Sequence, residues 1–498
     1  MKNMRKMFAL MLAVLMLCAC ITANAATITV DGDNNSAKYN IYLLLNATVD
    51  PTDDKKIAYS INEKYKDVLE GFFGADVDPV AQLAGFGADS AELNVFAKNI
   101  YAAITEKGIE ADATATGSTP SGNVGPGYVL IAETSLGEDS ADTYSLHVLH
   151  TVKGNNITIN TKEEAPTLVK KLKEKNDTTG EETDWQDGAD YDVKDDVPFQ
   201  LTGTLSNRYE NYETYYYQFE DEICEGLTFN QDSVKVYVYN DAASTEVTSA
   251  FTTAKTDKGF TVTCTDLKKI ANVDINADSQ IVVEYTATLN EQSLIGSQGN
   301  PNQAKLKYNN NPYYDGTEDP SSDENTSETP WDKVIVFTYQ LKVTKVDEAG
   351  NKLTGATFEL YKIVNDGNGE TQQLVKQIVG TDSSEFLFER LDAGKYILKE
   401  TKTPDGYNPI ADIEFTVKAT YDEEEADPLF GELSVVSTSE MNADSTSGTI
   451  ETEVENKAGA TLPETGGIGT TIFYVAGGVL VLLAVVLLVT KRRMGENN

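Results

Sequence analysis

The sequence predicts a mainly β protein: tandem β-sandwich domains preceded by an α+β N-terminal domain, with a transmembrane helix near the C-terminus of the precursor. Short runs rich in Val, Tyr, Thr and Phe recur through residues 166–457, separated by turn residues at sandwich-like intervals. Helical spacing of apolar residues is found instead in the segment before residue 110. An uncharged apolar span near 471–490 is long enough to cross a bilayer.

The first 25 residues have the pattern of a secretory signal peptide. A basic start precedes an apolar run from Met7 to about Cys20, and Ala23-Asn24-Ala25 is an A-x-A cleavage site. The mature chain is therefore expected to begin at Ala26. A lipoprotein signal with Cys20 as the lipidated residue is the less favoured alternative, because a cysteine at its second place fits poorly and the C-terminus supplies another anchor.

The C-terminal end carries three elements in a fixed order: LPETGG at 462–467, the apolar span, and the basic tail KRRMGENN. The basic cluster is expected to stay cytoplasmic by the positive-inside rule. This order resembles the cell-wall sorting signal of Gram-positive surface proteins. The resemblance implies that a sortase cysteine attacks the Thr465 carbonyl, releases Gly466 onward and passes Thr465 to an amine. The motif residues are Leu462, Pro463, Glu464, Thr465 and Gly466.

Composition excludes several classes of function. The net charge of −39 opposes binding to nucleic acid or anionic lipid. The two histidines, His147 and His150, have an odd spacing that puts them on opposite faces of a strand, so neither a shared metal nor a histidine-based triad is expected. No metal and no cofactor are predicted. Cys224 and Cys264 are the cysteines left after signal cleavage, and whether they form a disulfide stays open.

The chain divides into three predicted globular parts. An N-terminal α+β domain spans 26–165, with one helix capped by Ser90 and stopped near Gly108 and a second helix candidate over 59–74. A β-sandwich middle domain spans 166–338, and a second β-sandwich spans 339–457. Residues 458–467 form a tether that presents the sorting motif, 471–490 the membrane span and 491–498 the tail.

Strand alternation places three polar residues of the last domain on core faces. Lys345 shares a face with Leu341 and Val343, and by the same parity Glu400 and Asn456 point where hydrophobic side chains point. A buried lone ammonium is costly, so it must lose its proton, find a partner or react.

The middle domain repeats this trio in the same order along the chain. Lys170, Asp221 and Asn310 each lie on the apolar face of a predicted strand. Lys171 is adjacent and stays an alternative to Lys170, and Asn309 and Asn311 flank Asn310, although face parity favours Lys170 and Asn310.

These residue types suit one reaction. Burial favours a neutral, nucleophilic lysine amine and a protonated carboxyl group, which polarises the asparagine amide. The expected product is a Lys–Asn isopeptide bond, formed with loss of ammonia and without an enzyme. Such a bond would tie the first strand of a domain to its last.

Several motifs carry a family resemblance. KVTKVDEAGNKLTGATFELYK resembles the opening of a CnaB-type domain, GKYILKETKTPDGY its glutamate-bearing E-box, and VENK its closing strand. APTLVKKL, FEDEICEGLTF and LKYNNNP resemble the middle domain of Gram-positive sortase-assembled backbone pilins. The resemblance implies Ig-like (CnaA/CnaB-type) sandwiches, with the pairs Lys170–Asn310, assisted by Asp221, and Lys345–Asn456, assisted by Glu400.

Backbone pilins also use an exposed lysine, in a Tyr-Pro-Lys motif, to accept the threonine of the next subunit. This sequence has no Tyr-Pro-Lys, and Lys162 in NITINTKEEAP stands at the corresponding place, with Lys153 as the fallback.

The resemblance implies a structural pilus subunit rather than an enzyme. Its expected partners are a class C-type pilin sortase and a housekeeping sortase, other pilin subunits, peptidoglycan, and host or neighbouring-cell ligands in adhesion. The alternative is a monomeric wall-anchored adhesin, which needs no acceptor lysine.

Overall fold

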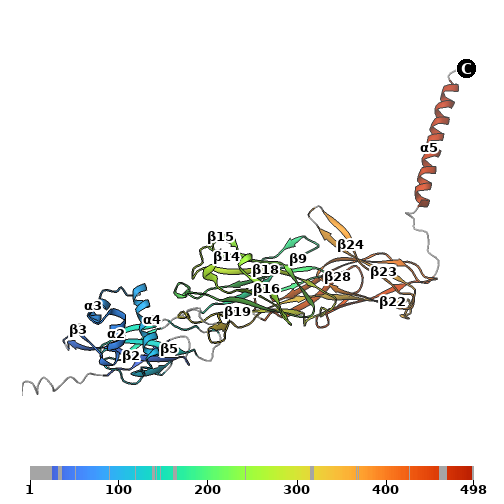
Figure 1. Ribbon diagram of the computed structural model, residues 1–498. Helices are drawn as coiled ribbons and strands as arrows, with labels where there is room; N and C mark the ends of the chain where they lie inside the picture. The colour runs from blue at the N-terminus through green and yellow to red at the C-terminus, as the bar shows by residue number, and fades with distance from the viewer. Residues whose placement is uncertain are drawn as a thin grey trace, which may run out of the picture.

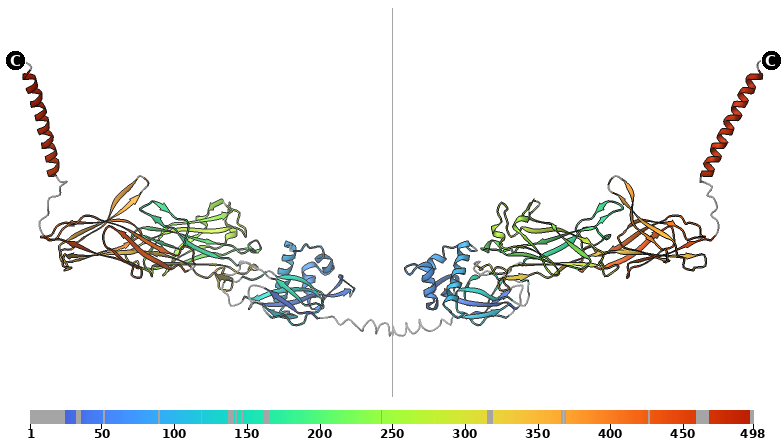
Figure 2. Two further views of the ribbon diagram at one scale, coloured as in Figure 1. Left: turned by 180° about the vertical axis from the view of Figure 1, so that it is seen from behind. Right: turned by 45° about the vertical axis from the view of Figure 1, so that its right-hand side comes forward.

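The computed structural model describes residues 25–495 except 32–35, 51, 89, 118, 137–140, 142, 146, 161–164, 242, 315–318, 366, 368, 426 and 459–467. Three globular parts follow one another in a row, the N-terminal part at one end, the middle part next, and the C-terminal β-rich part beyond it (Figure 1, Figure 2). The fold is mainly β, built from several sandwich sheets with a few N-terminal helices and a C-terminal apolar helix, as the sequence predicts.

The N-terminal part is an antiparallel sheet of order β3-β2-β5-β6 covered on one face by helices. Successive residues of β2 alternate between two cores: Tyr39 and Ile41 pack with the β1–β7 pair, while Tyr42 and Leu44 pack against α2 and α4. Its elements are β1 (Ile28–Asp31), β2 (Lys38–Asp50), β3 (Asp53–Ile61), η1 (Glu63–Tyr65), α2 (Lys66–Phe73), α3 (Pro79–Leu83), α4 (Ala91–Glu106), β4 (Ala113–Thr116), β5 (Gly127–Ser135), β6 (Val148–Val152) and β7 (Ile157–Asn160).

The predicted helix between Ser90 and Gly108 is confirmed. The Ser90 side chain accepts a hydrogen bond from the Leu93 backbone N–H, and Gly108 follows the helix end with a positive φ of 61°. The other helix candidate, 59–74, is only half right, because its first three residues continue β3 and helix α2 begins at Lys66.

The middle part is a sandwich of two sheets of orders β15-β14-β18-β12-β8 and β11-β21-β19-β13-β17-β16. Its elements are β8 (Leu168–Leu172), β9 (Lys175–Asn176), β10 (Glu181–Glu182), β11 (Gly188–Asp190), β12 (Asp196–Gly203), η2 (Tyr209–Asn211), β13 (Tyr217–Ile223), β14 (Leu227–Asn240), β15 (Ala243–Glu246), η3 (Thr248–Ala250), β16 (Thr252–Lys255), β17 (Gly259–Cys264), η4 (Leu267–Lys269), β18 (Gln280–Leu289), β19 (Asn300–Asn309), β20 (Thr326–Glu328) and β21 (Asp332–Phe337).

The C-terminal part pairs a four-stranded sheet, β25-β22-β30-β29, with a five-stranded sheet, β24-β23-β26-β27-β28. The first and last strands, β22 and β30, lie side by side and parallel. Its elements are β22 (Tyr339–Asp347), β23 (Thr357–Asn365), β24 (Glu370–Val379), β25 (Glu385–Leu391), β26 (Gly394–Lys402), β27 (Ile413–Tyr421), β28 (Phe430–Ser437), β29 (Asn442–Asp444) and β30 (Thr449–Asn456).

Helix α5 (Ile468–Gly495) contains a span, Ile472–Arg492, with a mean hydropathy of 2.9, which is long and apolar enough to cross a membrane.

Strand β21 joins the two sandwiches. Val334 and Val336 belong to the core of the middle part, whereas Ile335 and Phe337 pack in the C-terminal core. The domain boundaries drawn from the sequence stay predictions, and the shared strand indicates that the two sandwiches are tightly joined.

Candidate functional site

A lysine is buried at the centre of the middle sandwich. Lys170 lies on β8 between Leu168 and Leu172, with its side chain fully buried. Strand β8 pairs with β12, where Lys170 stands opposite Leu201. The sheet alternation that directs the two leucines into the core therefore directs the amine there as well.

The Lys170 amine reaches an acid and a phenol of neighbouring strands. Nζ forms an ion pair with Asp221 of β13 and donates to the Tyr285 hydroxyl of β18 at 2.9 Å. That hydroxyl donates to Asp221 Oδ2 at 2.8 Å and accepts from Asn302 Nδ2 of β19 at 2.8 Å. The cluster therefore joins both sheets of the sandwich, since β8 and β18 belong to one and β13 and β19 to the other.

Burial pushes both ionisable groups of this cluster toward their neutral forms. It lowers the pKa of Lys170 despite the opposing charge of Asp221, and it raises the pKa of Asp221 despite the charge of Lys170. Among the residues that the structure describes, Asp221 Oδ1 and Asn302 Oδ1 have no hydrogen-bond partner. The Lys170 amine and the Asn302 amide therefore contact the same hydroxyl, beside an acid whose protonated form is favoured by burial.

The prediction of Asn310 in this cluster is wrong. Ala304 stands opposite Asp221 in the β13–β19 pair, so Asn302 is two residues away and Asn310 six, or about 20 Å along the strand. Asn310 Nδ2 donates instead to Ser327 Oγ at 3.1 Å. Strand alternation correctly predicted the face that carries the asparagine, because residues 302 and 310 are separated by an even number of positions. Alternation does not fix how far along the strand the asparagine lies. Lys171, the alternative to Lys170, points elsewhere, to Asp187 and Glu424.

A second cluster lies in the C-terminal sandwich, where the predicted trio meets. Lys345 of β22, Glu400 of β26 and Asn456 of β30 all have buried side chains. Asn456 Nδ2 donates to the two Glu400 oxygens at 3.1 and 3.2 Å. Lys345 Nζ lies 3.9 Å from Glu400 Oε1 and donates to the Val454 carbonyl at 2.6 Å.

Register explains how the chain brings these three groups together. In the parallel pair β22–β30, Lys345 stands opposite Val454, two residues before Asn456 on the same face. Glu400 comes from the facing sheet. Burial lowers the pKa of Lys345 to about 8, so a minor fraction of the amine, on the order of a tenth, is neutral at pH 7.

A third buried lysine, missed in the sequence, differs in its surroundings. Lys362 of β23 makes ion pairs with Asp177 at 2.7 Å and with Asp192 and Asp392 at 2.6 Å each. Burial opposes its charge, but the three carboxylates outweigh burial and raise the pKa of Lys362. Asp177 and Asp192 come from the middle part and Lys362 and Asp392 from the C-terminal part, so an ammonium ion bridges the joint.

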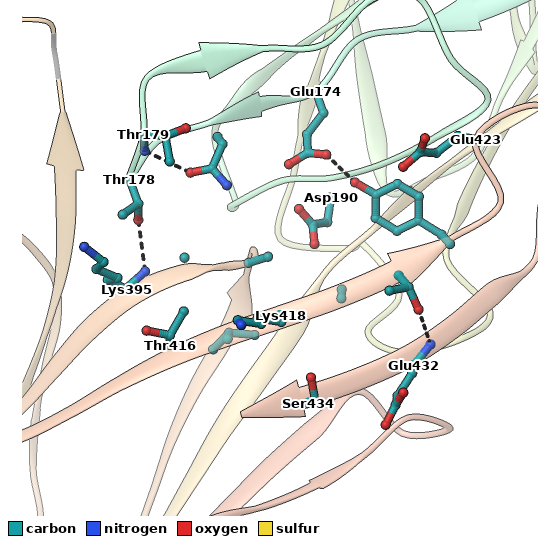
Figure 3. A pocket seen from close by; sticks show the side chains of 17 residues that line it. Glu174, Thr178, Thr179, Asp190, Lys395, Thr416, Lys418, Glu423, Glu432 and Ser434 are labelled. Atoms are coloured by element: carbon teal, nitrogen blue, oxygen red, sulfur yellow. Dashed lines mark hydrogen bonds between the residues drawn. The ribbon is translucent and has the colours of Figure 1, made fainter. Parts of the chain in front are cut away.

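A pocket opens beside this joint (Figure 3). Glu174, Thr178 and Asp190 of the middle part face Lys395 and neighbouring residues of the C-terminal sandwich. The Thr178 hydroxyl accepts a hydrogen bond from the Lys395 backbone at 2.9 Å. Such contacts between the two sandwiches hold the walls of the pocket together.

Cys224 and Cys264 do not pair, which settles the question that the sequence left open. Cys264 stands opposite Tyr217 in the antiparallel pair β13–β17, whereas Cys224 follows the far end of β13. Seven residues along a strand correspond to about 24 Å, far beyond the Cα separation of about 7 Å that a disulfide tolerates. Both are free thiols.

The predicted sites of transfer between subunits fall mostly outside the described residues. This holds for Lys162 and for the sorting motif, Leu462 to Gly466. The fallback Lys153 follows β6 and is exposed, with Nζ 3.3 Å from Asp54.

Known proteins resemble this chain in both sequence and fold. Residues 187–312 match the model of "Gram-positive pilin backbone subunit 2, Cna-B-like domain", 339–427 that of a prealbumin-like fold domain, and 454–494 that of the LPXTG cell wall anchor motif. The trypsin-resistant surface T6 protein of Streptococcus pyogenes is 26% identical over 329 residues, covering 55% of this chain and 60% of that protein. The chain thus spans about 60% of the length of this curated relative.

A solved structure shares the fold. The T6 backbone pilin of S. pyogenes superposes with a TM-score of 0.53 at 17% identity, covering 88% of this chain and 99% of that one. The full-length major pilin SpaD of Corynebacterium diphtheriae gives 0.45 at 18% identity, covering 88% and 98%.

The model matched over residues 187–312 is that of a structural pilin family and not of an enzyme family. The chain thus carries the domains of a Gram-positive pilin backbone subunit, a Cna-B-like and a prealbumin-like domain, together with an LPXTG cell wall anchor.

Proposed function

We propose that each sandwich of this backbone pilin closes itself with an internal isopeptide bond, Lys170–Asn302 in the middle part and Lys345–Asn456 in the C-terminal part. The observation that carries the proposal is the burial of an amine, an acid and an amide together at the junction of two sheets, twice in one chain. In both clusters burial lowers the pKa of the lysine amine.

The chemistry follows from these contacts. The neutral amine attacks the amide carbon, and the neighbouring acid, Asp221 or Glu400, assists the transfer of a proton from the amine to the departing ammonia. The fixed positions of the groups make the reaction effectively unimolecular. Each bond removes a buried amine and a buried amide that are costly to keep unpaired.

The crosslinks would join strands that are far apart in sequence. Strand β8 opens the middle sandwich and β19 is among its last, and β22 and β30 are the first and last strands of the next. Closing such long loops stabilises a fold partly by restricting its unfolded chain, as disulfides do. A reductant would not open these bonds.

We further propose that sortase joins the subunits through Thr465. A pilin-type sortase would pass Thr465 to a lysine of the next subunit, Lys162 or else Lys153, and a housekeeping sortase would attach the base of the polymer to peptidoglycan. The matched anchor motif and pilin model support this proposal. The polymer would then serve adhesion to host or neighbouring cells.

The alternative, a monomeric wall-anchored adhesin, shares the anchor but forms no polymer. Wall extracts of the native organism, boiled in sodium dodecyl sulfate and probed for this protein, distinguish the two. A ladder of covalent multimers that collapses to a monomer in Lys162→Arg, but not in Lys153→Arg, is the expected result. A single band in the unmodified strain would overturn polymerisation.

A further inference from the structure

Tyr285 occupies the centre of the first cluster. Its side chain is buried, and its hydroxyl oxygen contacts the Lys170 amine at 2.9 Å, Asp221 at 2.8 Å and the Asn302 amide nitrogen at 2.8 Å. One oxygen atom therefore contacts the nucleophile, the acid and the leaving group of the proposed reaction.

The second cluster shows why the first contains a phenol. There the Glu400 carboxyl group accepts directly from the Asn456 amide nitrogen, at 3.1 and 3.2 Å. In the first cluster the acid is an aspartate, one methylene shorter, and its Oδ2 receives the Tyr285 hydroxyl. The Asn302 amide nitrogen donates to Tyr285 instead, so the phenol spans the distance between acid and amide.

The phenol is also well placed to stay neutral. Phe199, Phe229 and Phe260 surround its ring, with centroid separations of 5.2, 5.8 and 4.9 Å. Burial raises the pKa of Tyr285 well above its usual value, which disfavours a free tyrosinate. A neutral phenol can move a proton only if it gains one as it gives one away.

We propose that Tyr285 is a catalytic residue of the Lys170–Asn302 crosslink, which relays a proton from the amine to the departing amide nitrogen. This inference rests on the proposed function. As the bond between Nζ and the Asn302 amide carbon forms, Nζ gives a proton to the Tyr285 oxygen. Once the carbon is tetrahedral, Nδ2 carries a lone pair, and the phenol turns its proton from Asp221 Oδ2 to Nδ2. The carbon–nitrogen bond then breaks and ammonia leaves. One proton moves from Nζ to Nδ2, and Tyr285 and Asp221 end as they began.

The test compares Tyr285→Phe with the unmodified chain of residues 26–460 during cell-free synthesis. Samples taken over time are digested, and the two crosslinked peptides are quantified by mass spectrometry. The Lys170–Asn302 peptide is expected to form about 100-fold more slowly, the lower range of general acid–base effects, while the Lys345–Asn456 peptide forms at its usual rate. Tyr237→Phe, on the neighbouring strand β14, is the matched control and should change neither rate.

The second crosslink serves as an internal control for folding of the C-terminal sandwich. If Tyr285→Phe disturbs the middle sandwich, fluorotyrosine at position 285 keeps the shape of the site, and its more acidic hydroxyl should change the rate of the first bond alone. An unchanged rate in both variants would overturn the role of Tyr285 and leave the crosslinks standing. The absence of both crosslinked peptides from the unmodified chain would instead overturn the proposed function.

Discussion

At the scale of single residues, the surroundings of a buried lysine decide its chemistry. Lys170 and Lys345 each face one acid, and burial lowers the pKa of both. Lys362 faces three carboxylates, which raise its pKa and keep it an unreactive ammonium. We therefore expect two crosslinks in this chain and a purely ionic contact at the third lysine.

Asn302 and Asn310 provide a sharp test of the first crosslink. Relative to the mass of its own sequence, Asn302→Ala should lose one ammonia molecule instead of two, because Lys170 no longer has an amide to react with. The middle sandwich should lose on the order of 5 kcal/mol of stability, by analogy with a disulfide closing a long loop. Intact mass and thermal unfolding measure the two effects. Asn310→Ala should still lose two ammonia molecules. A loss of two in Asn302→Ala and of one in Asn310→Ala would show instead that Lys170 pairs with Asn310.

Glu400 tests the second crosslink in the same way. Glu400→Gln cannot supply a proton, so the Lys345–Asn456 bond should fail to form while the first bond persists. Glu453→Gln, an exposed change on strand β30, is the control and should form both bonds. Peptide mapping distinguishes the outcomes, and a normal second crosslink in Glu400→Gln would show that the glutamate is not required.

At the scale of strands and helices, the sequence predicted which side chains face the core but not where along a strand they meet. Alternation correctly directed Lys170, Asp221 and Lys345 inward, because the pleat has a strict period of two. The height of Asn302 depends on the pairing of β13 with β19, strands separated by a long stretch of chain. A single sequence carries no signal for that register, and face parity by itself predicts Asn310.

The same limit explains the other differences. Only the register of the β13–β17 pair shows that the two cysteines lie too far apart to form a disulfide. Lys362 alternates inward like Lys345, but two of its partners, Asp177 and Asp192, lie in another sandwich. Contacts between domains leave no periodic trace in sequence, whereas helix α4, a local structure with its cap, was predicted almost to the residue.

His147 couples elements of the N-terminal part to the middle part. Its ring lies 4.0 Å from that of Tyr313 and 4.4 Å from that of Tyr101 on α4, and its backbone N–H donates to the Tyr313 hydroxyl at 2.6 Å. Burial lowers its pKa to about 3, against about 6.5 in an unfolded chain. The stabilisation is therefore complete above pH 6.5 and is lost as the pH falls toward 3.

At pH 5 the N-terminal part should be less stable than at pH 7 by about 2 kcal/mol because of this histidine. Thermal unfolding of the N-terminal transition at the two pH values measures the loss. His147→Phe should remove most of the difference, while His150→Gln should remove less of it, because partial burial and Lys153 lower the pKa of this exposed histidine as well. Equal pH dependence in His147→Phe and the unmodified chain would contradict the assignment.

At the scale of the whole molecule, ions, a shared strand and backbone contacts join the two sandwiches. Lys362 lies at this joint with three carboxylates around it. Lys362→Met would leave those carboxylates without their cation, at a cost of about 3 to 5 kcal/mol. Small-angle scattering should then show a less rigid molecule, and unfolding should occur at a lower temperature.

Lys376→Met, an exposed change on strand β24, controls for the loss of a lysine and should alter neither property. Lys362→Met should still lose two ammonia molecules. A smaller mass loss in this variant would mean that Lys362 takes part in a covalent bond, contrary to its ionic role.

The intact mass of residues 26–460 shows whether this backbone pilin crosslinks itself twice. We expect a mass below that of the sequence by two ammonia molecules, unchanged by reductant, with crosslinked peptides that join Lys170 to Asn302 and Lys345 to Asn456. A mass equal to that of the sequence would contradict this expectation and leave both clusters as unreacted buried polar groups.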